Sequence, residues 1–350
     1  MTDLPTRQTG AVYGSQQKWA VFLLAGAFVL TGMTAQATAD EQRIATLAPS
    51  GSTWMKTLER SAVEIEKATA GRVTIKYYPN GVQGDERDVI RKMGLGQLDG
   101  AAVTAVGLSL VYEGIRVLEL PRMFDSIEEM DYVRDKMWPY FRKKFLAKDF
   151  VLGDPGDVGP VHFFSQNPVR QLADLRKAKV WLWSDDPLAK AMFKKLNINA
   201  VPMGVPDVLP SLTTGRINAA YNSPLGAVAL QWSTKVKYMT GLQMTYSQGS
   251  SIFRKDVWMR ASKEDREAIS KVLRKQSQKL RGLVRRDNRT ATKQMEQKGM
   301  QQVDTSPEMI REFDAAAQEI WKDLVGKVYT QEELDMVLKY RDEYRAQAKK

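Results

Sequence analysis

Residues 174–224 read DLRKAKVWLWSDDPLAKAMFKKLNINAVPMGVPDVLPSLTTGRINAAYNSP, and this stretch indicates the fold. Lys179–Trp183 has the pattern of a short apolar strand, and Pro187–Leu196 has that of a helix. A second short apolar strand lies within Thr214–Pro224. A strand, a helix and another strand predict a βαβ unit, and therefore a parallel sheet with helices on its faces.

Four side chains stand at or near the carboxyl ends of these strands: Trp181, Trp183, Tyr221 and Asn222. Ligands of parallel sheets bind beyond those ends, so we expect a pocket there. Trp181 and Trp183 share one face of their strand, and packing beneath the helices is the alternative for both. For Trp183 we expect the core.

The N-terminus has the three parts of a secretory signal peptide. A basic flank precedes the apolar run Trp19–Leu30, and small residues end in Ala37-Thr38-Ala39. Twelve apolar residues are too few to cross a bilayer comfortably, which disfavours a membrane anchor. We therefore expect residues 1–39 to be removed after Ala39 and the mature chain to be soluble in the periplasm.

Composition limits the class of protein further. At 350 residues the chain is long enough for two domains, and it contains no cysteine, which excludes disulfides and lipid attachment through an N-terminal cysteine. The net charge is +11, but the basic residues are spread out and accompany no nucleic-acid motif. The densest basic cluster, residues 281–289, falls in a helical pattern, where a solvated face is expected; docking to an acidic membrane partner is the functional alternative.

The remainder of the chain alternates between strand and helix patterns. We expect strands at 41–48, 72–78 and 100–106, and helices at 53–70, 85–93, 126–147, 307–325 and 331–348. Pro121 favours an extended segment at 117–124, and strands and turns are expected at 235–261. The Gly/Pro/Asp-rich residues 153–160 predict a crossing between two lobes, and Ser262 opens a helix to Lys298 that is long enough to span both.

Catalytic and cofactor chemistry finds no support in the sequence. His162 is the only histidine, so neither a catalytic triad nor a histidine-rich metal site can be completed. Paired acids such as Asp185-Asp186 and Glu128-Glu129 fall at expected helix N-termini, where capping explains them. No glycine-rich phosphate loop is present. We expect a binding protein without metal or cofactor rather than an enzyme.

Short motifs in the same order along the chain resemble the solute-binding proteins of tripartite ATP-independent periplasmic (TRAP) transporters, of the C4-dicarboxylate-binding (DctP) type. The matching motifs are APSGS at 48–52, YPNG at 78–81, GDE at 84–86, GQLDGA at 96–101, LP at 120–121 with Phe124, DL at 174–175, and GRINAAYN at 215–222. Together they extend over nearly the whole chain after residue 39.

The resemblance implies an α/β, two-lobed periplasmic-binding-protein-like fold, with hinge-connected lobes and a long spanning helix. We place lobe I at 40–155, completed by about 246–285, and lobe II at 156–245, completed by about 286–350. Members of this family capture a small molecule and deliver it to the permease subunits of a TRAP transporter, with no chemistry done. Some pair through a long C-terminal helix, so a homodimer remains an open alternative.

The chain departs from the family where the ligand is held. The family's central strand usually follows the pattern Asp-Leu-x-Gly-x-Lys-x-Arg, whose arginine pairs with a ligand carboxylate, whereas here Trp181 takes that place. A second arginine, often found before the Asn-Pro of the preceding strand, is missing from residues 159–164. The asparagine that often assists carboxylate binding matches at Asn222.

These exchanges change the expected ligand. An indole has one N–H and no charge, so it cannot replace an arginine that neutralises an anion. We expect an apolar or aromatic ligand rather than a simple dicarboxylate, and a cation held over indole faces is a further option. An organic acid remains the alternative if Arg170, Arg176 or Arg216 reaches the pocket.

The residues expected to bind the ligand are Trp181, Asn222, Tyr221, Trp54, His162 and Phe163. Trp54 lies in the first expected helix, where amphipathic packing would also bury it, and a structural role is the alternative for His162. The function expected from the resemblance is that of a periplasmic TRAP solute-binding protein. The alternative is a periplasmic carrier or sensor of a lipid-like ligand that is no longer tied to a TRAP permease.

Overall fold

The computed structural model describes residues 40–348, and the expected signal peptide lies outside them. Ten strands form the sheet: β1 (Asp40–Thr46), β2 (Val73–Tyr78), β3 (Gly100–Thr104), β4 (Phe150–Ser165), β5 (Val180–Trp183), β6 (Ala200–Met203), β7 (Ala219–Asn222), β8 (Tyr238–Thr240), β9 (Thr245–Arg254) and β10 (Gln301–Val303). Their order is β2-β1-β3-β9-β4-β7-β5-β6, and β8 pairs with β4 and β10.

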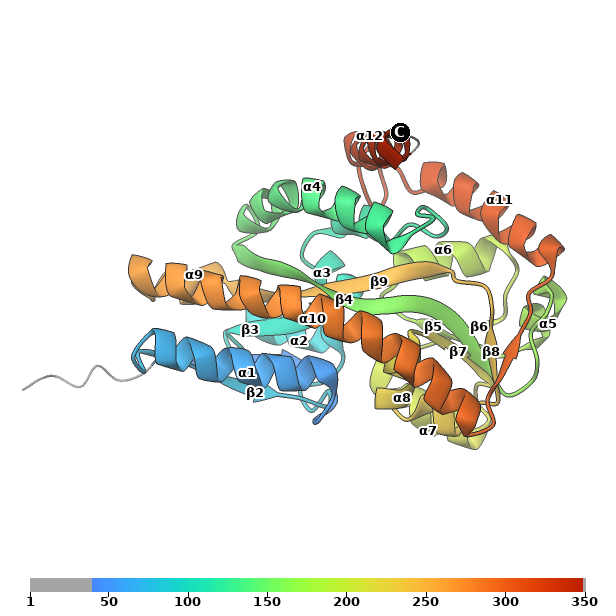
Figure 1. Cartoon of the computed structure of the whole chain (residues 1–350), viewed down its shortest axis with the longest axis horizontal. Helices are drawn as coiled ribbons and strands as arrows, with labels where there is room; N and C mark the ends of the chain where they lie inside the picture. Colours follow the sequence, from blue (N-terminus) through green and yellow to red (C-terminus); the bar gives the residue numbers. More distant parts are fainter. Residues whose placement is uncertain (1–39, 349–350) are drawn as a thin grey trace, which may run out of the picture. The chain divides into compact units, whose positions relative to one another are not determined.

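The helices cover this sheet (Figure 1). They are α1 (Thr53–Ala68), α2 (Glu86–Gly94), α3 (Ala105–Ser109), α4 (Ile127–Leu146), α5 (Leu172–Lys177), α6 (Pro187–Lys195), α7 (Val208–Thr214), α8 (Pro224–Ala229), α9 (Lys255–Trp258), α10 (Lys263–Gln297), α11 (Pro307–Asp323) and α12 (Gln331–Ala348), with 3-10 helices η1 (Glu113–Glu119), η2 (Val205–Asp207) and η3 (Trp232–Thr234). Within residues 40–348 no helix combines the length and apolar character that a bilayer crossing needs.

Two antiparallel strands, β4 and β9, join the two lobes. β9 pairs with β3, which continues to β1 and β2, and β4 pairs with β7, which continues to β5 and β6. The three strands on each outer side are parallel to one another. The expected two-lobed α/β fold is therefore confirmed, with β4 and β9 as the shared centre.

The βαβ prediction around residues 174–224 is confirmed in its strands and in its first helix, α6. The chain is more elaborate than predicted, because β6 and α7 lie between α6 and β7. β6 pairs with one side of β5, and β7 pairs with the other side through Val180 and Ala219. β6 contains Pro202 and lies at the edge of the sheet, which explains why its strand signal was missed.

Residues 153–160 form the middle of the 16-residue strand β4 rather than a loop. The register against β9 shifts between Leu152 and Pro155 and again between Asp157 and Gly159. Bulges of this kind bend a strand. Gly159 also has a φ of 130°, a value that residues with a side chain rarely adopt. The glycine and proline content thus marks bends in a strand that passes from one lobe to the other.

The expected extended segment at 117–124 is wrong for Val117–Glu119, which belong to η1. Val117 and Leu118 are fully buried, and Arg116 pairs with Glu119 three residues later. A 3-10 turn places residues i and i+3 directly above one another, so this ion pair favours the turn over an extended chain. Helix α9 was also missed within the expected strands and turns of 235–261.

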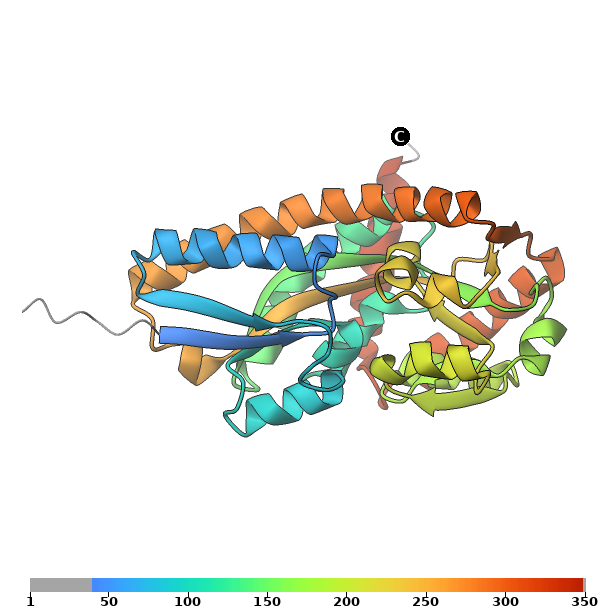
Figure 2. The same ribbon diagram turned by 90° about the horizontal axis from the view of Figure 1, so that it is seen from below.

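Helix α10 is the long spanning helix that the sequence predicted. Ser262 caps it by accepting a hydrogen bond from the Asp265 amide, and the helix extends for 35 residues to Gln297, which is about 50 Å. It packs on α1 and β4 and, further along, on α8 (Figures 1 and 2). The helix therefore contacts elements of both lobes.

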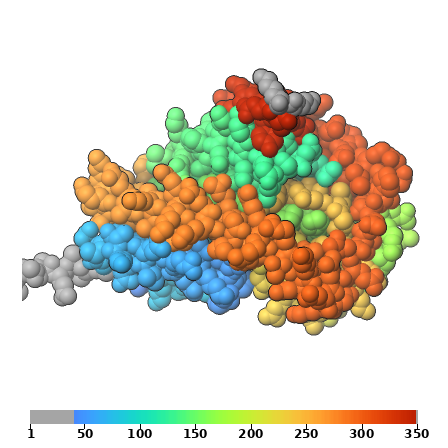
Figure 3. Space-filling view, viewed as in Figure 1, coloured from blue at the N-terminus to red at the C-terminus, as the bar shows by residue number. Residues whose placement is uncertain are grey.

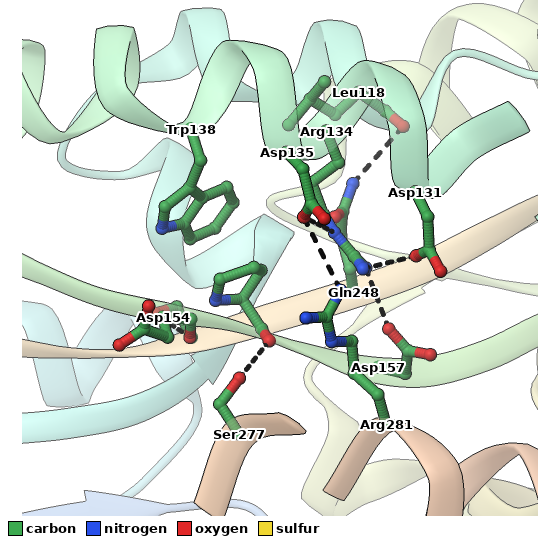
Figure 4. Close-up of polar contacts among 12 residues, drawn as sticks. Leu118, Asp131, Arg134, Asp135, Trp138, Asp154, Asp157, Gln248, Ser277 and Arg281 are labelled. Carbon is green, nitrogen blue, oxygen red and sulfur yellow. Dashed lines mark hydrogen bonds and ion pairs between the residues drawn. The ribbon is translucent and has the colours of Figure 1, made fainter. Parts of the chain in front are cut away.

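Where β4 crosses, a buried ionic network ties it to its neighbours (Figure 4). Asp157 is paired with Arg134 of α4 at 2.8 Å, and both side chains are fully buried. The same carboxylate accepts hydrogen bonds from Arg285 of α10 at 2.7 Å and from the Tyr246 hydroxyl of β9 at 3.0 Å. Asp131 completes the network by pairing with both arginines.

We predict that Asp157→Ala destabilises the protein strongly, because it leaves the buried Arg134 without its closest buried partner. Breaking a buried pair in this way costs about 3–5 kcal/mol. Urea unfolding followed by circular dichroism measures the change. Arg311→Ala is the control, since Arg311 pairs with Glu308 in solvent and such pairs contribute less than about 1 kcal/mol. Equal losses in the two variants would contradict the role given to the network.

Candidate functional site

A cavity of about 250 Å³ lies between the two lobes. The crossing strands β4 and β9 form one side of it, β5, β7 and α6 contribute from one lobe, and α1, η1 and the end of β3 contribute from the other. Its volume lies just below the usual range of small-molecule pockets, which is about 300–1,000 Å³. Most of the side chains that line it are apolar or aromatic.

Three aromatic rings form one wall of this cavity. Trp181 stacks on Tyr221 with ring centroids 4.7 Å apart, and on Trp183 at 6.0 Å. Each is less than 9% exposed, and all three line the cavity. The indole N–H of Trp181 donates to the Met203 carbonyl at 3.1 Å. These residues thus belong to the core and to the cavity wall at once, including Trp183, for which only a core position was expected.

A buried arginine is the main electrostatic feature of the cavity. Arg116 is 2% exposed, and its guanidinium donates to Glu119 at 2.6 Å and to Asp186 at 2.7 Å. Burial disfavours its charged form, but the facing carboxylates of Asp186 and Glu119 outweigh this and raise the pKa of Arg116. Burial also raises the pKa of Glu119. The Nε atom of Arg116 has no hydrogen-bond partner among the described residues.

The sequence analysis did not identify Arg116, although a signal was present. Arg116 and Glu119 are the only charged residues in the run Ile115–Leu120. Charged side chains of this kind are almost never fully buried unless they are paired, so an i, i+3 pair inside an apolar run indicates a buried ion pair. Asp186 was explained as a helix cap, and it does accept from the Leu188 and Ala189 amides. Its pairing with Arg116 depends on tertiary structure.

Two other expected residues also line the cavity. Trp54 reaches it from α1, and its indole N–H donates to the Asp157 carbonyl at 2.9 Å. Asn222 lies at the end of β7, where its side-chain oxygen accepts from the Ser223 amide at 2.7 Å. The structure therefore brings Trp54, Trp181, Tyr221 and Asn222 together around one cavity.

His162 and Phe163 lie elsewhere. Phe163 is fully buried against Phe193 and Phe313, each at 6.1 Å. His162 contacts the Thr240 carbonyl at 3.0 Å and borders a separate hollow between α10 and the start of α4, which Figure 3 shows. Burial lowers the pKa of His162. Neither side chain lines the cavity between the lobes.

Glu86 of α2 also lines the cavity, and it is buried without a cationic partner among the described residues. It is 2% exposed and accepts hydrogen bonds from the Thr104 amide at 2.7 Å and the Thr104 hydroxyl at 2.8 Å. Burial raises the pKa of Glu86 to about 8, since these hydrogen bonds offset only part of the cost of desolvation. Glu86 is therefore mostly protonated at neutral pH. None of the residues 40–348 forms an acidic, histidine or cysteine group suited to a metal ion.

The lobes also meet at the rim of the cavity. Asp85 accepts a hydrogen bond from the Trp183 indole at 2.8 Å, and Arg87 pairs with Asp185. Together with the Arg116–Asp186 pair, these contacts join α2 and η1 to the start of α6 and the end of β5. The structure is thus a closed form, in which the described cavity lies between lobes that contact one another.

Comparison with known proteins gives a consistent result. The model of the DctP family, described as "Bacterial extracellular solute-binding protein, family 7", matches residues 44–327. A solute-binding protein of Chromohalobacter salexigens is 29% identical over 61% of this chain, and the match spans 64% of that protein, just under two thirds of its length. A solute-binding protein of Roseobacter denitrificans is 25% identical over 73% of this chain and 78% of its own.

Solved structures share the fold. A TRAP periplasmic solute-binding protein of Xanthobacter autotrophicus with bound β-D-galacturonate superimposes with a TM-score of 0.80, at 23% identity, over 86% of this chain and 99% of its own. A sugar acid binding protein of Advenella mimigardefordensis in complex with galactonate superimposes with a TM-score of 0.81, at 20% identity. The match covers 87% of this chain and 99% of that protein. The resemblance found in the sequence is confirmed by these matches.

We predict that Glu86 makes stability fall as pH rises. The pKa of Glu86 in the folded protein lies above the ordinary value of 4.5. Its contribution to the free energy of unfolding is therefore complete below pH 4.5 and is lost as the pH rises toward 8. Glu86→Gln mimics the protonated acid. The free energy of unfolding of Glu86→Gln, minus that of wild type, should therefore increase by at most ~1.4 kcal/mol per pH unit between pH 5 and 8. Above pH 8 this difference should stay constant.

Urea unfolding of both proteins at pH 5, 6.5, 8 and 9 checks this. Glu308→Gln is the control, because that exposed carboxylate is already ionised above pH 5, so its difference from wild type should be constant over this range. A difference between Glu86→Gln and wild type that does not change with pH would show that Glu86 titrates normally.

Proposed function

Because the chain belongs to the family 7 bacterial extracellular solute-binding proteins, we propose that it is the periplasmic binding protein of a TRAP transport system. It captures one small molecule between its lobes and delivers it to the permease subunits in the membrane. The family comprises binding proteins rather than enzymes. Residues 40–155 and 156–245 form most of lobe I and lobe II, completed by about 246–285 and 286–350.

The ligand is an uncharged molecule with an aromatic or apolar body. The observation that carries this is the neutralisation of the Arg116 charge by Glu119 and Asp186. A ligand carboxylate in this cavity would meet a cation that is already neutralised by two buried acids, so its own desolvation would not be compensated. Trp181 and Tyr221 supply an aromatic wall, and Asn222 supplies a polar group at its edge.

A second candidate ligand is an organic acid. The neighbouring structures were determined with sugar acids such as β-D-galacturonate and galactonate. In this chain the unpartnered Nε–H of Arg116 is a hydrogen-bond donor that such an acid could use. The arginines first considered for this role lie outside the cavity lining: Arg170, Arg176 and Arg216. No contact within residues 40–348 favours the alternative of a carrier that is independent of a permease.

We predict that the protein binds 4-hydroxybenzyl alcohol more tightly than D-glucuronate in isothermal titration calorimetry. A ligand whose buried carboxylate stays unpaired loses about 1.5–3 kcal/mol of binding free energy relative to a ligand whose carboxylate meets a free cation. This corresponds to roughly 10- to 100-fold in affinity. Tight binding of D-glucuronate alone would establish the organic acid as the ligand class.

Asp186→Asn is predicted to raise the affinity for D-glucuronate at least about tenfold, because it releases one side of the Arg116 guanidinium. Asparagine also caps helices well, so the N-terminus of α6 is preserved. The matched control is Asp185→Asn, which removes a carboxylate from the same helix start but one that pairs with Arg87 at the rim. Equal effects of the two variants on D-glucuronate affinity would contradict the role given to Arg116.

A further inference from the structure

The cavity does not end at the cleft between the lobes. It continues within one lobe, between the sheet and the helices α1 and α10 that cover it. The side chains that line this extension include Leu58 and Ser61 of α1, and Leu273, Gln276 and Leu280 of α10. In Figure 2 these two helices lie side by side along the same face of the sheet.

Small residues of the strands beneath these helices line the extension. β4 contributes Gly153 and Gly156, and β9 contributes Ser250 and Ser251. A Cβ at Gly156 would lie 3.5 Å from the Leu280 side chain, which is van der Waals contact, so a side chain larger than alanine would close the gap between β4 and α10. Protein interiors are normally close-packed, and a run of small residues under two helices leaves room for a guest.

The extension also contains a buried acceptor without a partner. Gln276 is 1% exposed, and its amide nitrogen donates to Glu64 at 2.7 Å. Because Lys275 lowers the pKa of Glu64, that carboxylate is ionised and only accepts hydrogen bonds, which fixes the orientation of the Gln276 amide. Its carbonyl oxygen then has no hydrogen-bond donor among residues 40–348. An unpaired buried acceptor is costly, so a donor from a bound molecule would satisfy it.

We infer that the ligand is an elongated molecule that occupies both parts of the cavity. Its head lies in the cleft, where it offers an acceptor to the free Nε–H of Arg116. An apolar chain runs beneath α1 and α10 past Leu58, Leu273 and Leu280, and it ends in a hydroxyl that donates to Gln276. This inference rests on the proposed function, because it extends the uncharged ligand class to a length and a terminal group.

The test is a homologous series of ω-(4-hydroxyphenyl)alkan-1-ols with one, three, five and seven chain carbons, of which 4-hydroxybenzyl alcohol is the shortest. The phenol provides the acceptor for Arg116 and the terminal hydroxyl provides the donor for Gln276. Calorimetry should show an affinity that rises about fourfold per added methylene until the extension is filled. At one chain length, the alcohol should bind more tightly than the analogue that ends in a methyl group.

Two variants and one control locate the alkyl chain of the ligand. Ser61→Leu fills the extension from α1 and should remove most of the gain with length, while Val63→Leu, on the exposed face of the same helix, should keep the wild-type slope. Gln276→Met should reverse the preference for the terminal hydroxyl. Thermal unfolding of each variant establishes that it is folded before binding is compared.

The outcomes separate this inference from the proposed function. If the shortest alcohol binds but affinity does not rise with length, the extended ligand is overturned and the uncharged ligand class stands. A rise that persists in Ser61→Leu would place the chain elsewhere and also overturn the inference. If no member of the series binds, the proposed ligand class fails, and the inference fails with it.

Discussion

The structure depends on the buried carboxylate of Asp157. It lies where β4 passes from one lobe to the other, and it holds Arg134 of α4, Arg285 of α10 and Tyr246 of β9 at one point. A fully buried charge is tolerated only when it is paired and hydrogen-bonded, so these elements must keep their relative positions. Bends in β4 near Gly159 allow the strand to serve both lobes around this fixed centre.

A second set of buried charges determines what the cavity can accept. Arg116 is the only cation that lines it among the described residues, and Glu119 and Asp186 neutralise it. Glu86 is mostly protonated at neutral pH and adds little charge. The cavity therefore offers aromatic surface and a few hydrogen-bonding atoms, while two of the similar solved structures hold the sugar acids β-D-galacturonate and galactonate. This difference in electrostatics is the basis of the proposed ligand class.

Much of the fold could be predicted from local patterns. The cap at Ser262 and its helix were found because capping and amphipathic spacing are local signals, and the strand at 180–183 was found because it is short, apolar and bounded by polar residues. The cavity was only partly predictable. Family position predicted Trp181 as a pocket residue, and it lines the cavity, but the Arg116–Asp186 pair joins residues 70 positions apart, and no local pattern records it. Phe163 lies on the same strand as the cavity residue Val161, two residues further along. Its side chain is buried in the core and does not line the cavity.

We propose that the cavity selects an uncharged, largely apolar molecule. The most direct test is native mass spectrometry of the protein purified from its own host, followed by solvent extraction and identification of the molecule that co-purifies. The account predicts one uncharged aromatic or alkyl compound per chain, with a hydrogen-bonding group at each end. A sugar acid or dicarboxylate at one per chain would contradict it, and would mean that the Arg116 cluster rearranges to pair with a carboxylate.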